Sequence, residues 1–438
     1  MSRIILKNAT ILTHLGEVQP NRNILIEDSV IKEVTQKPVE ELGYLENKTE
    51  TEVIDCTDLY VSPGMTNLHA HTAMNIFKGI SEDVSAERWF NEMIWPYESK
   101  MEPEDVYLGT KLGIAEMINN GVTAFADHYF MEEEVLKAVQ EMGIRADIAP
   151  TVFGTAPNFK ERLQEVADFI EKNRNLSERV ALRMGPHAPY TCPMPYLKEI
   201  VDTAKQLKTG IHLHVSETRE QVAESRAAVN KTPFAVLGES DPGDMQVLVA
   251  HGLWVEPEDL QYINKEKTFF AFCPKTYMKL AMGCGNILEL KDQIQFSFGT
   301  DGAASSNTLN PVEQARIFAL MGKYEAFDPE TYEITYLWKQ LMNGHNAFSF
   351  NTGKIEKGYQ ADLCIWDLNK TNTFPVYNPL ISILYSSDST NVKYTMVAGD
   401  FLKKDGKLLL NETELMAEVQ TRKEALLARG RGQAQVTY

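Results

Sequence analysis

Eight apolar runs of strand length, separated by amphipathic stretches, fill the middle of this 438-residue chain. In order they read VSPGMTNLHAH, GVTAFADHY, IRADIAPTVFG, RVALRMGPHAPY, TGIHLHVSE, MQVLVAHG, KTFFAFCP and IQFSFGTDG. Strands that alternate with helices predict a parallel sheet covered by helices. Eight such units favour a closed (β/α)8 TIM barrel, and the first strand lacks the glycine fingerprint of a doubly wound nucleotide-binding sheet. We therefore predict an α/β fold whose barrel spans residues 58–350.

Short strands rich in β-branched residues, with glycine turns between them, lie on both sides of the predicted barrel. Their alternating apolar and polar positions are typical of a small β unit. Because such strands occur at both ends of the chain, we predict one composite β-sandwich domain from residues 1–57 and 351–412. Residues 413–438 predict a helical tail. Within the barrel, Pro103 and Gly121 bound an amphipathic stretch that predicts a helix.

The acidic composition restricts the partners that this chain can bind. Its formal net charge is −18, whereas nucleic acids and anionic membranes attract surfaces rich in lysine and arginine. No stretch reaches the roughly 18–20 apolar residues that would span a bilayer. The five cysteines are dispersed, with no C-x-x-C pair, which is typical of reduced thiols in a cytosol. We expect a cytoplasmic enzyme with a small-molecule substrate and no nucleic-acid or membrane partner; a homo-oligomer stays open.

Polar side chains close most of the predicted strands. The active sites of barrels lie at the carboxyl ends of the strands. The residues found there are His69 and His71 (first strand), His187 (fourth), His214 and Glu217 (fifth), His251 (sixth) and Asp301 (eighth). Histidines scattered through a core would not gather at one end of a barrel in this way. The pattern predicts a single site at the barrel mouth.

These residue types predict a hydrolytic metal centre. His69 and His71 are two positions apart, so both side chains point to the same face of a strand. With His214 and Asp301 they form a set of three imidazoles and one carboxylate that leaves room for water. A divalent metal lowers the pKa of bound water to about 7. No lysine closes the fourth strand to bridge two metals, so we expect one divalent metal ion.

Three residues are candidates for proton transfer. We expect Asp301 to accept the proton of the attacking water, Glu217 to carry a proton to the leaving side, and His251 to stabilise the developing charge. His212 lies deeper in the barrel, where we expect it either to support the ligands or to be a hydrogen-bonded core residue. For His128, at the end of the second strand, a place in the pocket and a place in the core stay open.

Five motifs, in order along nearly the whole chain, resemble those of the amidohydrolase superfamily: PGMTNLHAHTAM, HLHVSET, LVAHG, GTDGAASSN and GKIEKGYQADLCIWD. The resemblance implies a metal-bearing (β/α)8 barrel with a β-sandwich built from both termini, in agreement with the strand pattern. Two segments, FKGISEDVSAERWFNEMIWPYES and GPHAPYTC, are similar to one branch. That branch holds methylthioadenosine/S-adenosylhomocysteine deaminases and triazine chlorohydrolases.

The resemblance also implies the cofactor and the substrate contacts. In that branch one metal, zinc or alternatively iron, activates water to attack C6 of adenine, and ammonia leaves. Matching positions imply that Glu98 accepts hydrogen bonds from ribose hydroxyls, that His187 and Ser305 contact the substrate, and that Trp89 packs against it. A carboxylate suits a vicinal diol, and an aromatic wall suits a flat heterocycle. The alternatives are purely structural: Trp89 would be a core residue of a helix, and Glu98 a solvated residue on a helix surface.

Two departures from the branch pattern leave the substrate open. After the seventh strand, members usually carry H-N-P-x-S-N-x-K, whereas residues 272–280 read FCPKTYMKL. Lys275 and Tyr277 of this loop are candidates to meet a different heterocycle. Pro150 stands where homocysteine-binding deaminases can present an arginine, and Arg162 is the alternative ligand for a substrate carboxylate. A nucleoside without a carboxylate is therefore favoured.

The sequence thus predicts a metal-dependent hydrolytic deaminase of an aminated purine nucleoside, with 5′-methylthioadenosine, S-adenosylhomocysteine or adenosine as the leading type. One alternative is hydrolysis of another heterocycle at the same site, such as guanine, a pterin or a triazine, including removal of chloride. The remaining alternative is a non-catalytic metal-binding scaffold. It would lack a complete water-activating set, which Glu217, His251 and Asp301 supply.

Overall fold

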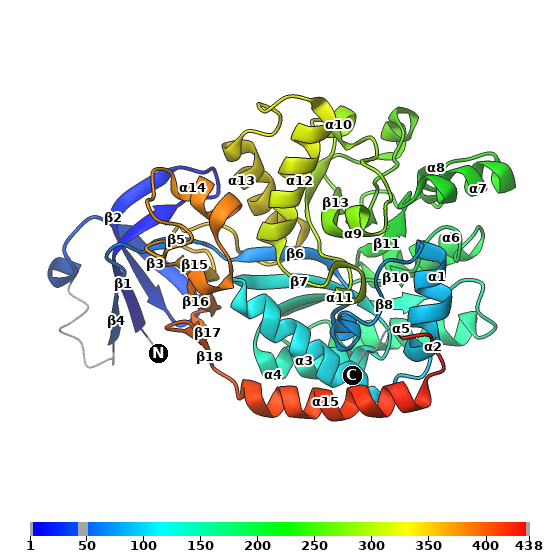
Figure 1. Cartoon of the computed structure of the whole chain (residues 1–438), viewed down its shortest axis with the longest axis horizontal. Helices are drawn as coiled ribbons and strands as arrows, with labels where there is room; N and C mark the ends of the chain where they lie inside the picture. The colour runs from blue at the N-terminus through cyan, green and yellow to red at the C-terminus, as the bar shows by residue number, and fades with distance from the viewer. Residues whose placement is uncertain (1–2, 43–50, 435–438) are drawn as a thin grey trace.

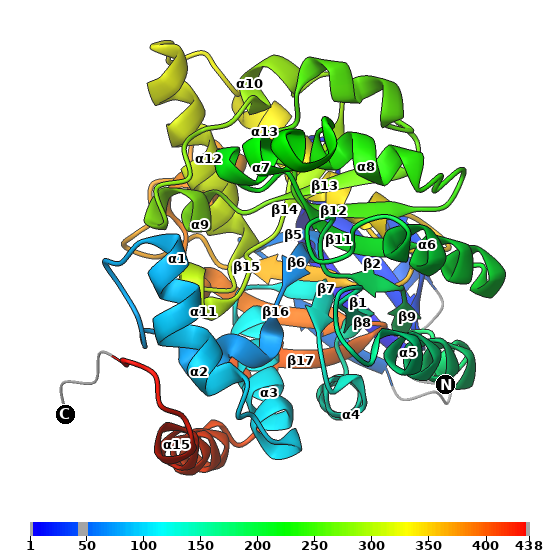
Figure 2. The same ribbon diagram turned by 90° about the vertical axis from the view of Figure 1, so that its right-hand side faces the viewer.

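Strands from the middle of the chain form the predicted barrel (Figure 1 and Figure 2). The computed structural model describes residues 3–42 and 51–434. The barrel strands are β6 (Met65–Ala70), β7 (Val122–Tyr129), β8 (Arg145–Val152), β9 (Val180–Leu182), β10 (Gly185–Pro186), β11 (Ile211–Val215), β12 (Val247–His251), β13 (Thr268–Phe272) and β14 (Gln295–Phe298). The short strands β9 and β10 both lie in the fourth predicted run, so every predicted run contributes to the barrel.

The barrel strands pair in two parallel groups that join at both seams. One group contains β6, β7, β8 and β10, and the other runs from β11 to β14. At one seam the backbone N–H of His212 donates to the carbonyl of Met184 at 3.0 Å. At the other, the N–H of Thr300 donates to the carbonyl of His69 at 2.9 Å. This second bond holds the carboxyl end of β14 beside the carboxyl end of β6.

The inside of the barrel is apolar toward the amino ends of the strands. Small and branched side chains from facing strands pack there, among them Leu68, Ala124, Ala126, Leu248, Phe269 and Ala271. All of them are buried. Polar residues at the opposite, carboxyl ends of the strands therefore lie above this apolar cluster.

Amphipathic helices cover the outside of the barrel. In α6, the buried residues recur at the spacing of one helix face: Leu197, Ile200, Val201, Ala204 and Leu207. The helices are α1 (Ala86–Arg88), α2 (Trp95–Glu98), α3 (Pro103–Asn119), α4 (Glu132–Met142), α5 (Phe159–Asn173), α6 (Tyr196–Leu207), α7 (Arg219–Val229), α8 (Pro233–Glu239), α9 (Pro274–Lys279), α10 (Ile287–Leu290), α11 (Ala303–Ser306), α12 (Pro311–Ala326), α13 (Ile334–Asn343), α14 (Pro379–Ile381) and α15 (Glu412–Arg429). A π-helix, η3 (Trp89–Ile94), joins α1 to α2. Within residues 3–42 and 51–434, no helix combines the length and apolar character needed to cross a bilayer.

The two ends of the chain combine in one further sheet, beside the barrel in Figure 1. Its strands are β1 (Arg3–Leu12), β2 (Val18–Glu27), β3 (Val30–Thr35), β4 (Thr51–Asp55), β5 (Tyr60–Pro63), β15 (Leu363–Trp366), β16 (Val392–Val397), β17 (Asp400–Lys404) and β18 (Lys407–Leu408). The halves meet where β5 pairs with β1 on one side and with β15 on the other. Ile11 and Ile24 from the first half pack with Ile365 and Met396 from the second. This confirms the β-sandwich domain built from both termini.

The first predicted strand run contains two strands that belong to different sheets. β5 pairs in the terminal sheet and β6 in the barrel, with Gly64 between them. A Cβ atom on Gly64 would lie 2.2 Å from the side chain of Thr123, so a larger residue would force the strands apart. The sequence does not reveal the break between β5 and β6, because both strands are buried and their residues form one continuous apolar run. The barrel strand itself therefore begins at Met65.

A buried ion pair ties the two domains together. Arg145, at the start of β8, binds Asp362 through Nε–Oδ2 and Nη2–Oδ1 contacts of 2.7 and 2.9 Å. Both side chains are almost fully buried, at 2% and 0% exposure. The same carboxylate accepts the backbone N–H of Ala398 at 2.9 Å. A bidentate pair in this setting gives the domain interface a defined orientation.

Candidate active site

Seven of the nine histidines meet at the carboxyl end of the barrel: His69, His71, His128, His187, His212, His214 and His251. Centroids of neighbouring rings lie between 4.8 and 6.3 Å apart. The rings come from β6, β7, the segment after β10, β11 and β12. Closure of the barrel is what brings them together.

Three of these rings and one carboxylate form a compact donor set. One nitrogen from each of His69, His71 and His214 lies within 4.8 Å of the other two. Oδ1 of Asp301 lies 3.4 Å from Nε2 of His71 and 3.9 Å from Nε2 of His69. The structure therefore brings together all four residues that the sequence predicts as metal ligands.

Hydrogen bonds to backbone carbonyls determine the tautomers of two of these rings. Nδ1 of His71 lies 2.6 Å from the carbonyl oxygen of His128, and Nδ1 of His214 lies 2.8 Å from that of His187. A carbonyl oxygen only accepts, so both Nδ1 atoms carry the hydrogen and both Nε2 atoms present lone pairs. The two Nε2 atoms are 3.2 Å apart. Two lone pairs this close repel each other unless a cation lies between them.

The surroundings of His69 also favour a cation at this position. Its Nδ1 lies 3.0 Å from Nε2 of His212, which therefore contacts a candidate ligand. Its Nε2 is buried with no hydrogen-bond partner among the described residues. Leaving a buried polar atom unsatisfied costs about 1–3 kcal/mol. A cation held with Asp301 would satisfy this nitrogen.

The cluster is neutral at physiological pH. Burial lowers the pKa of His71 and of His214 to about 4. Burial, reinforced by repulsion from His71, holds the pKa of His69 well below its usual range. Neutral imidazole is the form that binds metals. Three neutral nitrogens and one carboxylate oxygen fit a single divalent metal ion.

Residues 60–402 match the model of the amidohydrolase family. The chain belongs to this family. It is similar to the 5-methylthioadenosine/S-adenosylhomocysteine deaminase of Dictyoglomus turgidum, at 33% identity over 426 residues, 96% of this chain and 98% of that protein. It is similar also to the 5′-deoxyadenosine deaminase of Methanosphaera stadtmanae, at 32% identity over 426 residues, 95% of this chain and 97% of that protein.

Solved structures share the fold of this amidohydrolase. An adenosine deaminase from Xanthomonas campestris with bound zinc matches with a TM-score of 0.90 at 24% identity, over 97% of this chain and 98% of that chain. An atrazine chlorohydrolase from Arthrobacter aurescens TC1 complexed with zinc matches with a TM-score of 0.83 at 20% identity, over 97% and 100%. These likenesses confirm the predicted fold class, a TIM barrel with a β-sandwich domain.

The candidate proton-transfer residues of this amidohydrolase lie around the donor set. Asp301 turns one oxygen toward the histidines, while its Oδ2 accepts the hydroxyl of Ser305 at 3.0 Å. Nε2 of His251 lies 3.6 Å from Oε1 of Glu217. The ring of His251 also stacks on that of His214, with centroids 5.4 Å apart. An imidazole–carboxylate pair and the carboxylate of Asp301 thus lie beside the histidine cluster.

Two of these residues adopt an uncommon backbone conformation. The φ angles of His251 and Asp301 are 68° and 59°. A left-handed conformation at a residue with a side chain costs about 1–3 kcal/mol and is found where the surroundings enforce it, often at functional sites. Here the N–H groups of Thr300 and Asp301 both donate to the carbonyl of His69. These bonds hold the turn after β14 beside His69.

Two predicted substrate residues, Glu98 and Trp89, lie on the short helices before α3. Glu98 is 7% exposed, and its Oε1 accepts the hydroxyl of Tyr129 at 2.7 Å. Burial raises the pKa of Glu98 to about 7. Glu98 is therefore not a solvated surface residue. The indole N–H of Trp89 donates to the carbonyl of Ala304 at 3.3 Å, which holds this ring over the turn that carries Asp301.

The other two predicted substrate residues differ in exposure. His187 is partly exposed, its Nδ1 lies 2.9 Å from the hydroxyl of Thr191, and its ring packs against Phe153 with centroids 4.8 Å apart. Ser305 is buried, and besides Asp301 its hydroxyl contacts the hydroxyl of Thr276 at 3.1 Å.

Three expectations about the side chains around the site need correction. Tyr277 is fully buried, and its hydroxyl accepts the backbone N–H of Cys273 at 2.9 Å, so it stabilises its own loop. Lys275 is engaged by Glu313, with Nζ–Oε distances of 2.9 and 3.0 Å. Neither side chain is free to meet a heterocycle.

Arg162 is likewise held within the protein. It forms a bidentate ion pair with Glu132 at 2.9 and 2.8 Å, and its Nε donates to the carbonyl of Thr151. The carboxylate that Arg162 binds is therefore one from its own chain.

Sequence reasoning did not assign Tyr129 and Thr276, and it left His128 undecided. Tyr129 binds Glu98, and Thr276 binds Ser305. The signal for Tyr129 was its place at the carboxyl end of β7, beside His128. His128 is buried, its Nδ1 lies 3.2 Å from the hydroxyl of Thr151, and its backbone carbonyl orients His71.

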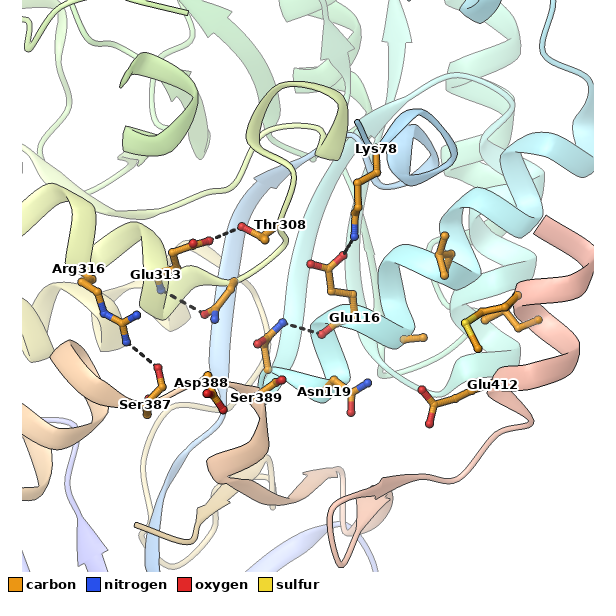
Figure 3. Close-up of a pocket in the computed structure, with 16 residues that line it drawn as sticks. Lys78, Glu116, Asn119, Thr308, Glu313, Arg316, Ser387, Asp388, Ser389 and Glu412 are labelled. Atoms are coloured by element: carbon orange, nitrogen blue, oxygen red, sulfur yellow. Dashed lines mark hydrogen bonds and ion pairs between the residues drawn. The ribbon is translucent and has the colours of Figure 1, made fainter. Parts of the chain in front are cut away.

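Three clefts at the surface lie away from the histidine cluster, with volumes of about 430, 670 and 640 Å³. Figure 3 shows the first, between α3, α12 and α15. Two of its charged side chains are engaged within the protein: Lys78 pairs with Glu116 at 2.5 Å, and Arg316 donates to the carbonyl of Ser387 at 2.7 Å. The bond from Arg316 joins α12 to a segment that follows the barrel.

Proposed function

We propose that this amidohydrolase is a metal-dependent deaminase of adenosine-type nucleosides. Water adds to C6 of the purine, N1 receives a proton, and cleavage of the C6–N bond releases ammonia and a 6-oxopurine. The observation that carries the proposal is the Glu217–His251 pair beside the donor set, because expulsion of ammonia needs an acid at the ring. Two relatives that align along nearly the whole chain are named as deaminases of adenosine derivatives, which supports this choice.

The chain's own residues divide the proton transfers. When bound, the divalent metal lowers the pKa of water to about 7. Asp301 takes the proton of the attacking water at a carboxylate oxygen. Glu217 delivers its proton to N1, a task suited to a carboxylic acid. The proton that Asp301 took passes to the departing nitrogen, and the remaining hydroxyl proton of the adduct returns to Glu217 as the 6-oxo group forms. His251, through Nε2, donates a hydrogen bond to the oxygen that adds to C6.

Recognition of the nucleoside falls to the other side of the mouth. Glu98 would accept hydrogen bonds from the vicinal ribose hydroxyls, since a buried carboxylate is a strong acceptor. Trp89 would pack its ring on the purine. His187 and Ser305 would contact the substrate from the segments after β10 and β14.

The 5′ substituent that fits best is uncharged. Pro150 carries no donor, and Arg162 is neutralised by its bidentate pair with Glu132. Binding a substrate carboxylate would require breaking that pair. We therefore propose 5′-deoxyadenosine, 5′-methylthioadenosine and adenosine as better substrates than S-adenosylhomocysteine.

We propose zinc as the native metal, with iron as the alternative. A set of imidazole and carboxylate donors suits zinc. Both solved structures named above contain zinc and share this fold. The acidic composition supports a cytoplasmic enzyme for a small molecule, with no nucleic-acid or membrane partner.

A second candidate function is hydrolysis of another heterocycle, such as guanine, a pterin or a triazine. The fold match with an atrazine chlorohydrolase favours this alternative. It predicts turnover without a ribose, and so no contribution from Glu98. A non-catalytic scaffold would bind metal and turn over none of these compounds.

One screen of the zinc-loaded enzyme separates these candidates. Ammonia release is measured with adenosine, 5′-deoxyadenosine, 5′-methylthioadenosine, S-adenosylhomocysteine, guanine, a pterin and an aminotriazine, and chloride release with a chlorotriazine. We expect the highest kcat/KM with a nucleoside that has an uncharged 5′ substituent. Turnover of a triazine or free base, with none of any adenosine derivative, would overturn the proposal.

A further inference from the structure

The segment that carries Trp89 and Glu98 consists of three very short helices. They are α1, the π-helix η3 and α2, and together they span residues 86–98. Helices this short are not stable by themselves, and π-helical turns are uncommon. On the outer face of the segment, Phe90 and Trp95 are each 45% exposed. The position of the segment must therefore come from what binds it on its other sides.

On the barrel side, the two candidate substrate residues are themselves the anchors. Trp89 donates to the carbonyl of Ala304, and Glu98 accepts from Tyr129. Met93 and Ile94 between them are buried against the barrel. These contacts leave the far side of the segment to be held by another part of the chain.

Residues 430–434, which follow α15, bind that far side, and both views show the chain rising there beside α2 (Figure 1 and Figure 2). The hydroxyl of Tyr97 donates to the carbonyl of Gly432 at 2.7 Å and lies 3.3 Å from the backbone nitrogen of Ala434. The N–H of Gln433 donates to the carbonyl of Glu92 at 3.0 Å. The tail thus touches the segment on both sides of Trp95.

Two glycines make this approach possible. A Cβ atom on Gly430 would lie 2.2 Å from Cδ1 of Tyr97, and one on Gly432 would lie 2.2 Å from Cε2 on the opposite edge of the ring. Such distances are far inside van der Waals contact. The ring of Tyr97, itself 5% exposed, is therefore enclosed between two residues that must lack side chains.

Ion pairs anchor the tail just beyond the segment. Arg422 of α15 binds Asp105 through Nε at 2.7 Å and Glu102 through Nη2 at 2.5 Å. Arg429 binds the same two carboxylates, and its Nε donates to the carbonyl of Lys100 at 3.2 Å. Asp105 is fully buried at the start of α3. The helix is therefore fixed to the barrel on the side where the segment ends.

We infer that residues 412–434 position the nucleoside-binding segment: they hold Trp89 and Glu98 at the mouth of the barrel. The inference rests on the proposed function, in which these two residues bind the substrate. The hydrogen bonds and ion pairs given above hold residues 412–434 to residues 92–105, away from the candidate metal ligands, so loosening them should weaken substrate binding while leaving the chemical step intact. Tyr97, Gly430 and Gly432 are thus positioning residues.

The test compares three variants of the zinc-loaded enzyme. In Gly430→Ala/Gly432→Ala the new methyl groups push the tail off Tyr97. Tyr97→Phe keeps the ring and removes the hydroxyl contacts, so it remains informative if the double variant does not fold. Gln433→Ala is the matched control, because the side chain of Gln433 is exposed and its backbone N–H is retained. Readouts are hydrogen exchange of residues 86–99, zinc content, KM and kcat.

We expect the double variant to exchange faster over residues 86–99 and to raise KM about tenfold, with kcat and zinc content within about twofold of the wild type. Tyr97→Phe should show a smaller change in the same direction, and Gln433→Ala none. Unchanged exchange or unchanged KM in the double variant would overturn the inference, as would a loss confined to kcat. A failure of the proposed function would show in a different variant. Glu98→Gln, in a protein with an unaltered tail, would then leave KM unchanged.

Discussion

Replacing Glu98 with glutamine removes a buried titrating group from the substrate side of the mouth. Burial raises the pKa of Glu98 from 4.5 to about 7. In the unfolded chain the carboxyl group is solvated, so the unfolded state loses the proton first as the pH rises. Charging this group then costs free energy only in the folded protein. The contribution of Glu98 to stability therefore becomes less favourable from pH 5 to pH 8.

The size of this effect follows from the two pKa values. Each tenfold difference in proton affinity is about 1.4 kcal/mol, so the wild type should lose about 2.5 kcal/mol from Glu98 between pH 5 and pH 8. The Glu98→Gln variant does not titrate there, so its stability relative to the wild type should rise by that amount. With an unfolding entropy of about 2.1 cal/mol/K per residue, a chain of 438 residues converts this into about 3 °C of Tm.

Calorimetry at pH 5, 6.5 and 8 measures this change. Wild type and variant are compared after chelation, because a bound cation would lower the pKa of a nearby carboxylate. Glu87→Gln is the matched control, since Glu87 is an exposed residue of α1. Its Tm difference from the wild type should not vary with pH. A Glu98→Gln difference that is equally flat from pH 5 to pH 8 would refute the reasoning.

Kinetics of the zinc-loaded enzyme test the function of the same carboxylate. A hydrogen bond to a charged acceptor contributes about 1.5–3 kcal/mol, so Glu98→Gln should raise KM for a ribonucleoside about 10- to 100-fold. A 2′,3′-dideoxy nucleoside lacks the diol, and its KM should change little. Equal losses for both substrates would contradict a role of Glu98 in binding the ribose.

Three further predictions concern the metal centre and the domain interface. Asp301→Asn and Glu217→Gln should each lower kcat by about 100-fold or more with an unchanged circular-dichroism spectrum, and near-normal ammonia release from either would disprove the assigned roles. Elemental analysis should find close to one divalent metal per chain, and chelation should abolish turnover until zinc is restored; two metals per chain would contradict the single site. Asp362→Asn should lower the free energy of unfolding by about 3–5 kcal/mol, because it leaves Arg145 buried and unpaired. Breaking the exposed Lys404–Glu52 pair with Lys404→Gln should change it by about 1 kcal/mol or less, and equal effects of the two variants would refute this assignment.

Much of the fold and of the donor set could be predicted because the signals are local. Apolar runs of strand length and amphipathic helices follow from the periodicity of neighbouring residues. The carboxyl ends of barrel strands meet by topology, so His69, His71, His214 and Asp301 could be grouped before any distance was known. The same apolar pattern also joined two strands into one prediction. β5 and β6 are both buried, so their residues form one apolar run, and the close approach of Gly64 to Thr123 between them is evident only in the folded protein.

What the sequence by itself determined is which residues are candidate ligands and what chemistry they would allow, because residue type and strand register are properties of adjacent positions. Tertiary structure alone decided which side chains remain free to act. Lys275, Tyr277 and Arg162 look available in the sequence, yet each is engaged by a partner within the folded chain. The contacts of Glu98 with Tyr129 and of Tyr97 with Gly432 join residues that are 31 and 335 positions apart. Such contacts depend on packing across the whole molecule, which no local pattern encodes.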